Sequence, residues 1–445
     1  MTRRALLLAW SAVFAVWTVS LSGDFLKDDE SNFVGNPAVS MPSSWPGFFL
    51  LKGANSRDPE LTGIYRPLPT LSYAVTARLA GFNPFFFHLI DTAGHAANAA
   101  LVLLIGWGLT RSLPAAAAGA VLFAFHPAQA ESVSYVSGAR PSVFSLLFCL
   151  LALRAHEKKC RGRALAFFAA AVLFKESALG LPFALAAWQW ARSPRKTARD
   201  VARESAPYFI IAALFTLFRA VVLGHTTDSG LYGGKLASHI GFALSGLAVH
   251  VRSAGWPYGQ RLCYTLPDPH GWALPAVGAI LLAAIAFAFI HAARRRRAWL
   301  AGLGWAAAFL LPVSNVIPIS TLAADRYLYA SFAGLAWLVA LACARAPRRW
   351  SWLPAAALAA WLVPLCVERQ LDWQSSFTID LAADRASEDA CTSALLGVEY
   401  FNWGMNARAR DYAREGLSRH PGPVLRAYLE KMNELLDVRT RKSHR

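Results

Sequence analysis

Long apolar blocks divide this chain of 445 residues, and each is close to the length of a membrane-spanning helix. The clearest blocks cover residues 5–22, 207–223, 272–292, 299–317 and 328–344. A helix needs roughly 20 apolar residues to cross the hydrocarbon core of a bilayer. Apolar residues make up 56% of the sequence, above the about 45–50% of a soluble globular chain. The pattern predicts an all-α, polytopic membrane helix bundle.

The formal net charge of +17 indicates topology rather than a nucleic-acid partner. Basic residues lie in short clusters between the apolar blocks, and such clusters mark cytoplasmic loops. Twenty of the 44 Lys and Arg residues fall in these loops, together with only three acids, Glu157, Asp200 and Glu204. We therefore expect the bilayer, and no nucleic acid, among the partners of this chain.

Alternation of the basic clusters predicts about eleven spans, with the N-terminus inside and the C-terminus outside. The first block is interpreted as a retained span rather than a signal peptide, because its apolar stretch of about 18 residues exceeds an ordinary signal h-region. Residues 65–84 are too short and interrupted to span, so they are expected along the outer surface. The spans are expected near residues 5–22, 84–110, 113–127, 133–153, 163–174, 178–191, 206–223, 271–291, 299–317, 327–344 and 350–366.

These spans define a membrane domain at residues 1–367 and a tail at 368–445. The domain includes an outer loop at 23–65. A segment at about 235–258 is interpreted as interfacial or re-entrant, because a span there would move the arginines at 294–297 outside. The tail resembles one degenerate tetratricopeptide helix pair on the outer face, which would have to pack on the membrane domain or a partner. The alternative is an amphipathic helical cap of no repeat family.

The six cysteines show no spacing typical of a disulfide framework or a zinc site. Cys263 and Cys391 would both lie on the outer face, where a disulfide between them is an alternative that the sequence leaves open.

Ionisable residues gather at the outer ends of the expected spans. Such residues at membrane depth are costly and are candidates for a functional site. Asp28 and Asp29 follow the first span, and His88, Asp91 and His95 share one helix face at i, i+3 and i+7. The remaining members are Arg66, His126, Glu131, Arg140, Lys175, Glu176, Asp325 and Arg326.

Each of these groups also has a purely structural explanation. Asp91 and His95 can pair inside the bundle, Lys175 and Glu176 can form a solvated pair, and acids can flank an outward span end without penalty. Together, however, acids, histidines and cations converge on one membrane face from five junctions. That arrangement suits a reaction at the bilayer surface on a lipid-linked anionic substrate.

The chemistry can be stated for glycosyl transfer to a hydroxyl. A carboxylate must accept the hydroxyl proton, a role that Asp28 or Asp29 can fill. Cations or a metal must stabilise the departing phosphate, and arginine binds phosphate in a bidentate manner. The candidates for that role are Arg140, Lys175, Arg326 and Arg66.

Six motifs in order resemble the GT-C superfamily of polytopic glycosyltransferases, and within it the transmembrane-and-tetratricopeptide protein O-mannosyltransferases and their bacterial relatives. The likeness covers roughly residues 5–367. The motifs are DDESNFVGNP, YRPLPTLSYA, GFNPFFFHLIDTAGHAANAALVLL, LFAFHPAQAESVSYVSGARP, FKESALGLPF and ADRYLYASFAGL.

The resemblance implies inverting transfer from a polyprenyl-phosphate sugar to an acceptor hydroxyl. It places the catalytic base on Asp28, with Asp29 as its neighbour, and matches Glu131 to an acid that orients the acceptor or a divalent cation. Metal dependence is left open, with a divalent cation as one option. The chain departs from the family in three ways: Arg140 stands one place later and is followed by Pro141, Asp91 replaces an asparagine, and the tail holds about one repeat rather than an array.

The sequence thus predicts a membrane glycosyltransferase, with a secreted protein's Ser or Thr, or a glycan or lipid, as acceptor. We expect it in a bacterial inner membrane, with the catalytic face and tail in the periplasm. The rival hypotheses are a proton-coupled transporter or lipid flippase, which would favour Asp91 and His95 over Asp28, and a non-catalytic assembly factor.

Overall fold

The computed structural model describes residues 2–51, 55–57, 65–193, 195–224, 230–262, 264, 272–295, 298–319, 321–387, 389–419 and 423–443. Every regular element in these ranges is helical. The predicted all-α class is therefore confirmed.

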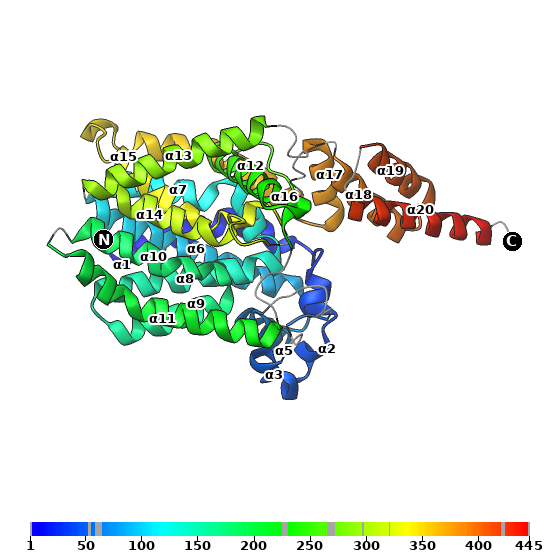
Figure 1. Ribbon diagram of the computed structural model, residues 1–445, viewed down its shortest axis with the longest axis horizontal. Coiled ribbons are helices and arrows are strands. Elements are labelled where there is room, and N and C mark those ends of the chain that lie inside the picture. Colours follow the sequence, from blue (N-terminus) through cyan, green and yellow to red (C-terminus); the bar gives the residue numbers. More distant parts are fainter. Residues whose placement is uncertain are drawn as a thin grey trace.

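Most of the helices run side by side in one bundle, with the N-terminus at one end and the tail beyond the other (Figure 1). Six of the described segments are long and apolar enough to cross a membrane. They are Arg3–Ser22, Pro84–Thr110 (α6), Val136–Glu157 (α8), Ala198–Leu223 (α11), Ala273–Arg294 (α13) and Arg348–Asp372. The chain is thus a multi-pass membrane protein, whereas the number eleven stays a prediction.

The expected span boundaries lie close to those of the helices. The first segment consists of α1 (Arg3–Trp17) and a short 3-10 turn, and the last contains α16 (Leu353–Asp372). Asn83 and Ser112 cap the helices that follow them. The shorter bundle helices are α7 (Leu113–Phe125), α9 (Arg161–Phe174), α10 (Leu181–Arg192), α14 (Trp299–Leu310) and α15 (Ser331–Cys343).

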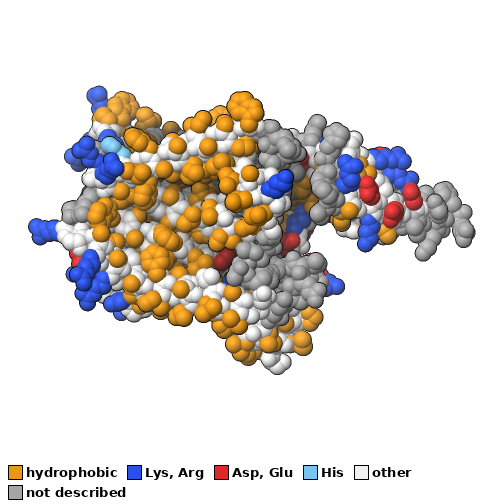
Figure 2. Space-filling model, in the orientation of Figure 1, with side chains coloured by type: hydrophobic (Ala, Val, Ile, Leu, Met, Phe, Trp, Pro, Cys, Tyr) orange, Lys and Arg blue, Asp and Glu red, His pale blue; other side chains and the backbone are white. Residues whose placement is uncertain are grey.

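Small residues let the bundle helices approach one another closely, as is common in membranes. A Cβ on Gly119 of α7 would lie 2.1 Å from the Ala336 carbonyl oxygen of α15. Buried tryptophans fill the space between helices and donate to backbone carbonyls, Trp17 to Ala124 at 2.9 Å and Trp337 to Val102 at 3.2 Å. An apolar band covers the visible side of the bundle, and Lys and Arg gather at the end away from the tail (Figure 2).

Short helices form the outer loop at the tail end of the bundle (Figure 1). Stacked aromatic rings of Phe33, Tyr73 and Phe87 join this loop to α5 and α6. Residues 65–84 are expected along the outer surface, and the helix that they contain, α5 (Pro67–Ala80), has 14 residues. This helix is too short to be a candidate span. The elements are a π-helical turn (Glu30–Val34), α2 (Pro37–Ser40), a 3-10 turn (Pro42–Ser44), α3 (Gly47–Leu50) and α5 (Pro67–Ala80).

The ambiguous segment forms α12 (Leu236–Gly255), which packs against α13. A Cβ on Gly278 of α13 would lie 2.0 Å from the Leu244 carbonyl oxygen, so the two helices are in close contact. The interfacial or re-entrant position of α12 stays a prediction.

The tail contains α17 (Ser376–Ala386), α18 (Ala390–Asn402), α19 (Asn406–Ser418) and α20 (Pro423–Ser443). Helices α18 and α19 form the expected pair, and α20 covers it through Leu429 and Leu436. The pair's apolar face is thus partly covered within the tail itself. Its assignment to the tetratricopeptide class stays a prediction.

Cys391 of α18 is disulfide-bonded, although no disulfide framework is evident from cysteine spacing. Cys263, the other cysteine expected on the outer face, lies outside the described residues.

Candidate active site

The three consecutive acids after α1 occupy different environments. Asp29 is fully buried, whereas Asp28 and Glu30 are exposed. The resemblance assigns the base to Asp28, and the difference in burial is independent information about the separate roles of Asp28 and Asp29.

Asp29 connects the outer loop to the start of α8. Its Oδ1 accepts a hydrogen bond from the Ser137 backbone N–H at 2.7 Å, and its Oδ2 accepts one from Leu26 N–H at 2.8 Å. A carboxylate at a helix N-terminus satisfies free N–H groups and complements the helix dipole. Burial raises the pKa of the Asp29 carboxyl to about 7, although these hydrogen bonds oppose the shift. Asp29 therefore fixes the loop in place.

Asp28, unlike Asp29, is exposed. Its backbone N–H donates to the Tyr135 hydroxyl at 3.2 Å, and the Tyr135 ring stacks on Trp373 with centroids 5.7 Å apart. Burial and the Asp28 and Asp29 carboxylates raise the pKa of Tyr135 well above its ordinary value, while Arg326 opposes the shift. Asp28 forms no ion pair within the described part of the chain. It is an accessible carboxylate in a fixed loop.

Glu131 and Arg326 form the second part of the site. The Glu131 carboxylate is buried and accepts both the Arg326 backbone N–H, at 2.8 Å, and the Arg326 guanidinium. The Arg326 side chain keeps 26% of its surface exposed. The buried Glu131 carboxylate thus holds the partly exposed Arg326 guanidinium at the surface of the site.

Arg66, Lys175 and Glu176 form the third part. Arg66 binds Glu176 in a bidentate manner, with Nε at 2.9 Å and Nη2 at 2.5 Å from the two carboxylate oxygens. Lys175 is buried and donates to Ser142 Oγ at 2.8 Å. Burial and the nearby cations Arg66 and Arg326 lower the pKa of Lys175 to about 7. The ion pair with Glu176 brings Arg66 to the junction that holds Lys175, and the charge of Arg326 also acts on Lys175 there.

Asp325 lies next to this junction but faces inward. Its Oδ1 accepts hydrogen bonds from Ser253 at 2.6 Å and from the Tyr264 hydroxyl at 2.7 Å. Burial raises the pKa of Asp325 to about 7, with the charge of Glu131 adding to the shift. This carboxylate connects α12 to the segment that carries Arg326.

Arg140 and Asp91 lie deeper in the bundle and pair with each other. Arg140 Nε is 2.5 Å from Asp91 Oδ1, and their side chains are 1% and 0% exposed. The guanidinium also donates to Ser72 Oγ at 3.0 Å and lies over the Tyr73 ring. Asp91 thus pairs with Arg140, not with His95.

The three predicted histidines are buried and separate from the carboxylates. His95 contacts the Tyr329 hydroxyl at 2.9 Å and the Ala124 carbonyl at 3.1 Å. His126 accepts the Ala128 N–H at 3.3 Å. His88 lies against Gly23, at the start of the outer loop. Their positions are typical of packing groups.

Tyr135, Ser253 and Tyr264 belong to the site but were not predicted. Tyr135 stands within the motif that carries Glu131 and Arg140, so its position in that motif was an available signal. Ser253 and Tyr264 lie in the segment after α11, where no motif marks them.

Metal binding is not supported by the donor set. In the described ranges, no three His, Cys, Asp or Glu side chains come together as metal ligands. Both Asp29 oxygens already accept backbone N–H groups, and Glu131 binds Arg326.

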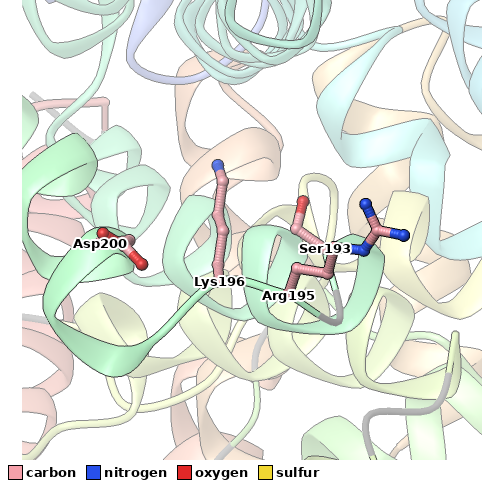
Figure 3. Close-up of a pocket in the computed structure, with 4 residues that line it drawn as sticks. All are labelled: Ser193, Arg195, Lys196 and Asp200. Carbon is pink, nitrogen blue, oxygen red and sulfur yellow. The ribbon is translucent and has the colours of Figure 1, made fainter.

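A cavity of about 410 Å³ lies away from these groups, in the loop between α10 and α11 (Figure 3). Ser193, Arg195, Lys196 and Asp200 line it. Lys196 pairs there with Glu204 at 2.6 Å, and Asp200 caps α11 through Thr197. The loop belongs to the basic end of the bundle, opposite the candidate site.

No protein-family model matches the chain. The chain is 35% identical over 146 residues to the protein O-mannosyl-transferase TMTC1 of Mus musculus, which is 31% of this chain and 15% of that protein. It is 30% identical over 161 residues to the protein O-mannosyl-transferase TMTC2 of Homo sapiens, 34% of this chain and 18% of that protein. The alignments thus span less than a fifth of either relative.

One solved structure is also similar, the crystal structure of ArnT from Cupriavidus metallidurans bound to undecaprenyl phosphate. It aligns with 93% of this chain and 80% of that chain, at 14% identity and a TM-score of 0.44. The sequence matches confirm the resemblance that the motifs predict: over about a third of its length, this chain is a homologue of the protein O-mannosyl-transferases.

Proposed function

We propose that this chain is an inverting membrane glycosyltransferase that moves a sugar from a polyprenyl-phosphate donor to an acceptor hydroxyl. The observation that carries the proposal is the exposed Asp28 carboxylate in a loop fixed at Asp29, in a chain that also keeps the Arg66 and Arg326 guanidiniums partly exposed. A base beside cations is the arrangement that this transfer requires.

Asp28 acts as the general base. As the acceptor oxygen attacks the anomeric carbon, its proton moves to the Asp28 carboxylate and the new glycosidic bond forms. The bond from the anomeric carbon to the phosphate oxygen breaks, and its electron pair leaves with the phosphate. Attack opposite the leaving group inverts the anomeric centre. Asp29 holds the loop, and Glu131 positions Arg326.

Arg66, Lys175 and Arg326 bind the donor phosphate. Partly exposed guanidiniums at Arg66 and Arg326 are available for charge-assisted hydrogen bonds, which are stronger than neutral ones. Lys175 is buried beside them, so an anion at the junction would restore the charge that burial disfavours. Arg140 was predicted for the same role, but its buried pair with Asp91 favours a structural one.

We place this site and the tail on the periplasmic face of a bacterial inner membrane. Lys and Arg gather at the opposite end of the bundle, in agreement with the positive-inside rule (Figure 2). The disulfide at Cys391 in α18 supports the same orientation, because disulfides persist in oxidising compartments.

The acceptor is proposed to be a Ser or Thr hydroxyl of a secreted protein, since the relatives are protein O-mannosyl-transferases. A glycan or lipid hydroxyl is the alternative within the same reaction. Transport is disfavoured, because the Asp91 carboxylate that proton coupling would use is buried against Arg140, and His95 is buried against Tyr329.

The test is transfer by the purified protein in detergent. The protein is incubated with labelled polyprenyl-phosphate sugars and a secreted-protein acceptor, followed by mass analysis of the acceptor. Asp28→Asn should lower transfer by about 10²–10⁴-fold, the range for loss of a general base, while Glu30→Gln, its exposed neighbour, should retain it. Undiminished transfer by Asp28→Asn would remove Asp28 as the base.

A further inference from the structure

The tail contacts the acidic loop at the residue before Asp28. Lys27 Nζ lies 2.5 Å from Asp380 Oδ2 of α17 and 3.7 Å from Glu399 Oε1 of α18. Asp380 is fully buried, and Lys27 keeps 19% of its side chain exposed. A buried carboxylate from the tail thus holds a cation of the loop, 353 residues away in sequence.

Asp28 therefore lies between two anchored neighbours that different parts of the chain hold. Lys27 is held by the tail, and Asp29 is held by the N-terminus of α8. The Asp28 carboxylate is exposed between these anchors. With both neighbours fixed, the backbone at Asp28 is held from two sides.

The backbone conformation of Lys27 indicates what the Lys27–Asp380 ion pair does. Lys27 has φ of 47°, a left-handed conformation that a lysine rarely adopts. Residues in sparsely populated conformations persist only when the surrounding structure holds them there. The pair with Asp380 supplies such a hold, so without it the loop can relax toward ordinary φ and turn Asp28.

The tail is attached to the membrane domain by contacts other than the Lys27–Asp380 pair. The Asp24 N–H donates to the Gln374 carbonyl at 2.9 Å, and Ser22 donates to the Gln374 side chain at 2.8 Å. Trp373 stacks on Tyr135 at the same place. These contacts keep the chain between α16 and α17 docked, so the removal of one charge from α17 should leave the tail in position.

We propose that Asp380 is a positioning residue for the transfer reaction: it holds Lys27 in its left-handed conformation and so directs the Asp28 carboxylate at the acceptor. This inference rests on the proposed function and extends it, because it makes the tail part of the catalytic arrangement. Asp380 itself does not touch the substrate.

The test uses full-length protein and separates kcat from the donor KM. Asp380→Asn keeps the side-chain shape but weakens the hold on Lys27, so kcat should fall about tenfold or more, as misplacement of a catalytic group does. The donor KM should change little, because the cations that bind phosphate lie elsewhere. The matched control is Asp384→Asn on the same helix, whose partner is Arg419 at 3.6 Å; it should keep the wild-type kcat.

A double-mutant cycle shows whether Asp380 acts through Lys27. Lys27→Ala and Asp380→Asn should each lower kcat, and the double variant should lose no more than the stronger single variant. Losses that multiply would overturn the proposal. If Asp380→Asn fails to fold by size-exclusion profile, Lys27→Ala carries the same test, since Lys27 is partly exposed.

The outcomes also distinguish this inference from the proposed function. Wild-type kcat in Asp380→Asn or Lys27→Ala, with Asp28→Asn inactive, overturns the positioning role alone. Wild-type transfer by Asp28→Asn overturns the proposed function, and the positioning role with it.

Discussion

The Arg140–Asp91 pair inside the bundle and the Arg66–Glu176 pair at the outer junction have the same chemistry in different surroundings. The first is 1% and 0% exposed, and the second is 25% and 36% exposed. Both were predicted as parts of one site. A sealed pair satisfies its own charges and stabilises the bundle, whereas a half-exposed pair keeps donor positions that a substrate can use.

The largest expected effect comes from breaking the sealed pair. Arg140→Met leaves the Asp91 carboxylate buried without a partner, which should cost about 3–5 kcal/mol of stability. Thermal unfolding in detergent, followed by tryptophan fluorescence, measures this change.

A matched double variant separates lost pairing from lost volume. Arg140→Met with Asp91→Leu replaces both charges by apolar groups and should recover most of the stability. If Arg140→Met alone unfolds at the wild-type temperature, the pair is not structural, and Arg140 returns to the list of phosphate-binding candidates.

Breaking the exposed Arg66–Glu176 pair should affect donor binding rather than stability. Arg66→Gln should change stability by less than about 1 kcal/mol, as is usual for exposed ion pairs. It should raise the donor KM about 10–150-fold, because a charge-assisted hydrogen bond to phosphate is worth about 1.5–3 kcal/mol. Titration of transfer with donor concentration measures the effect; an unchanged KM would exclude Arg66 from the donor site.

A change in pH should have a smaller effect on the donor KM. Because burial lowers the pKa of Lys175 to about 7, this side chain is mostly charged below that pH and mostly neutral above it. Donor binding should therefore weaken as pH rises from about 6 to about 8, with KM rising several-fold. Lys175→Arg keeps its charge across this range and should flatten the profile. A steep profile in that variant would assign the titration to another group.

Sequence patterns predicted the bundle well because hydrocarbon length and basic clusters are local signals. The helix at Pro84–Thr110 has the bounds expected for residues 84–110. The partners of charged residues were not predictable, because they depend on packing between distant segments. Asp28 and Asp29 are adjacent and identical in type, yet it is the Asp29 carboxylate that accepts the Ser137 backbone N–H at the start of α8, 108 residues later.

The same reason explains Lys27 and Arg140. No motif joins Lys27 to Asp380, and the pattern that placed Asp91 and His95 on one helix face did not reveal that α8 supplies the partner of Asp91. Periodicity predicts which face a residue occupies, but the identity of the opposing side chain comes only from the packed helices.

The most direct measurement of the account is sugar transfer by Asp28→Asn and Asp29→Asn from a labelled polyprenyl-phosphate donor, each with its thermal stability. Asp28→Asn should unfold at the wild-type temperature and lose about 10²–10⁴-fold in kcat. Asp29→Asn should lose stability, about 1–3 kcal/mol, because its amide cannot accept both backbone hydrogen bonds. Wild-type transfer by Asp28→Asn would contradict the assignment of Asp28 as the base.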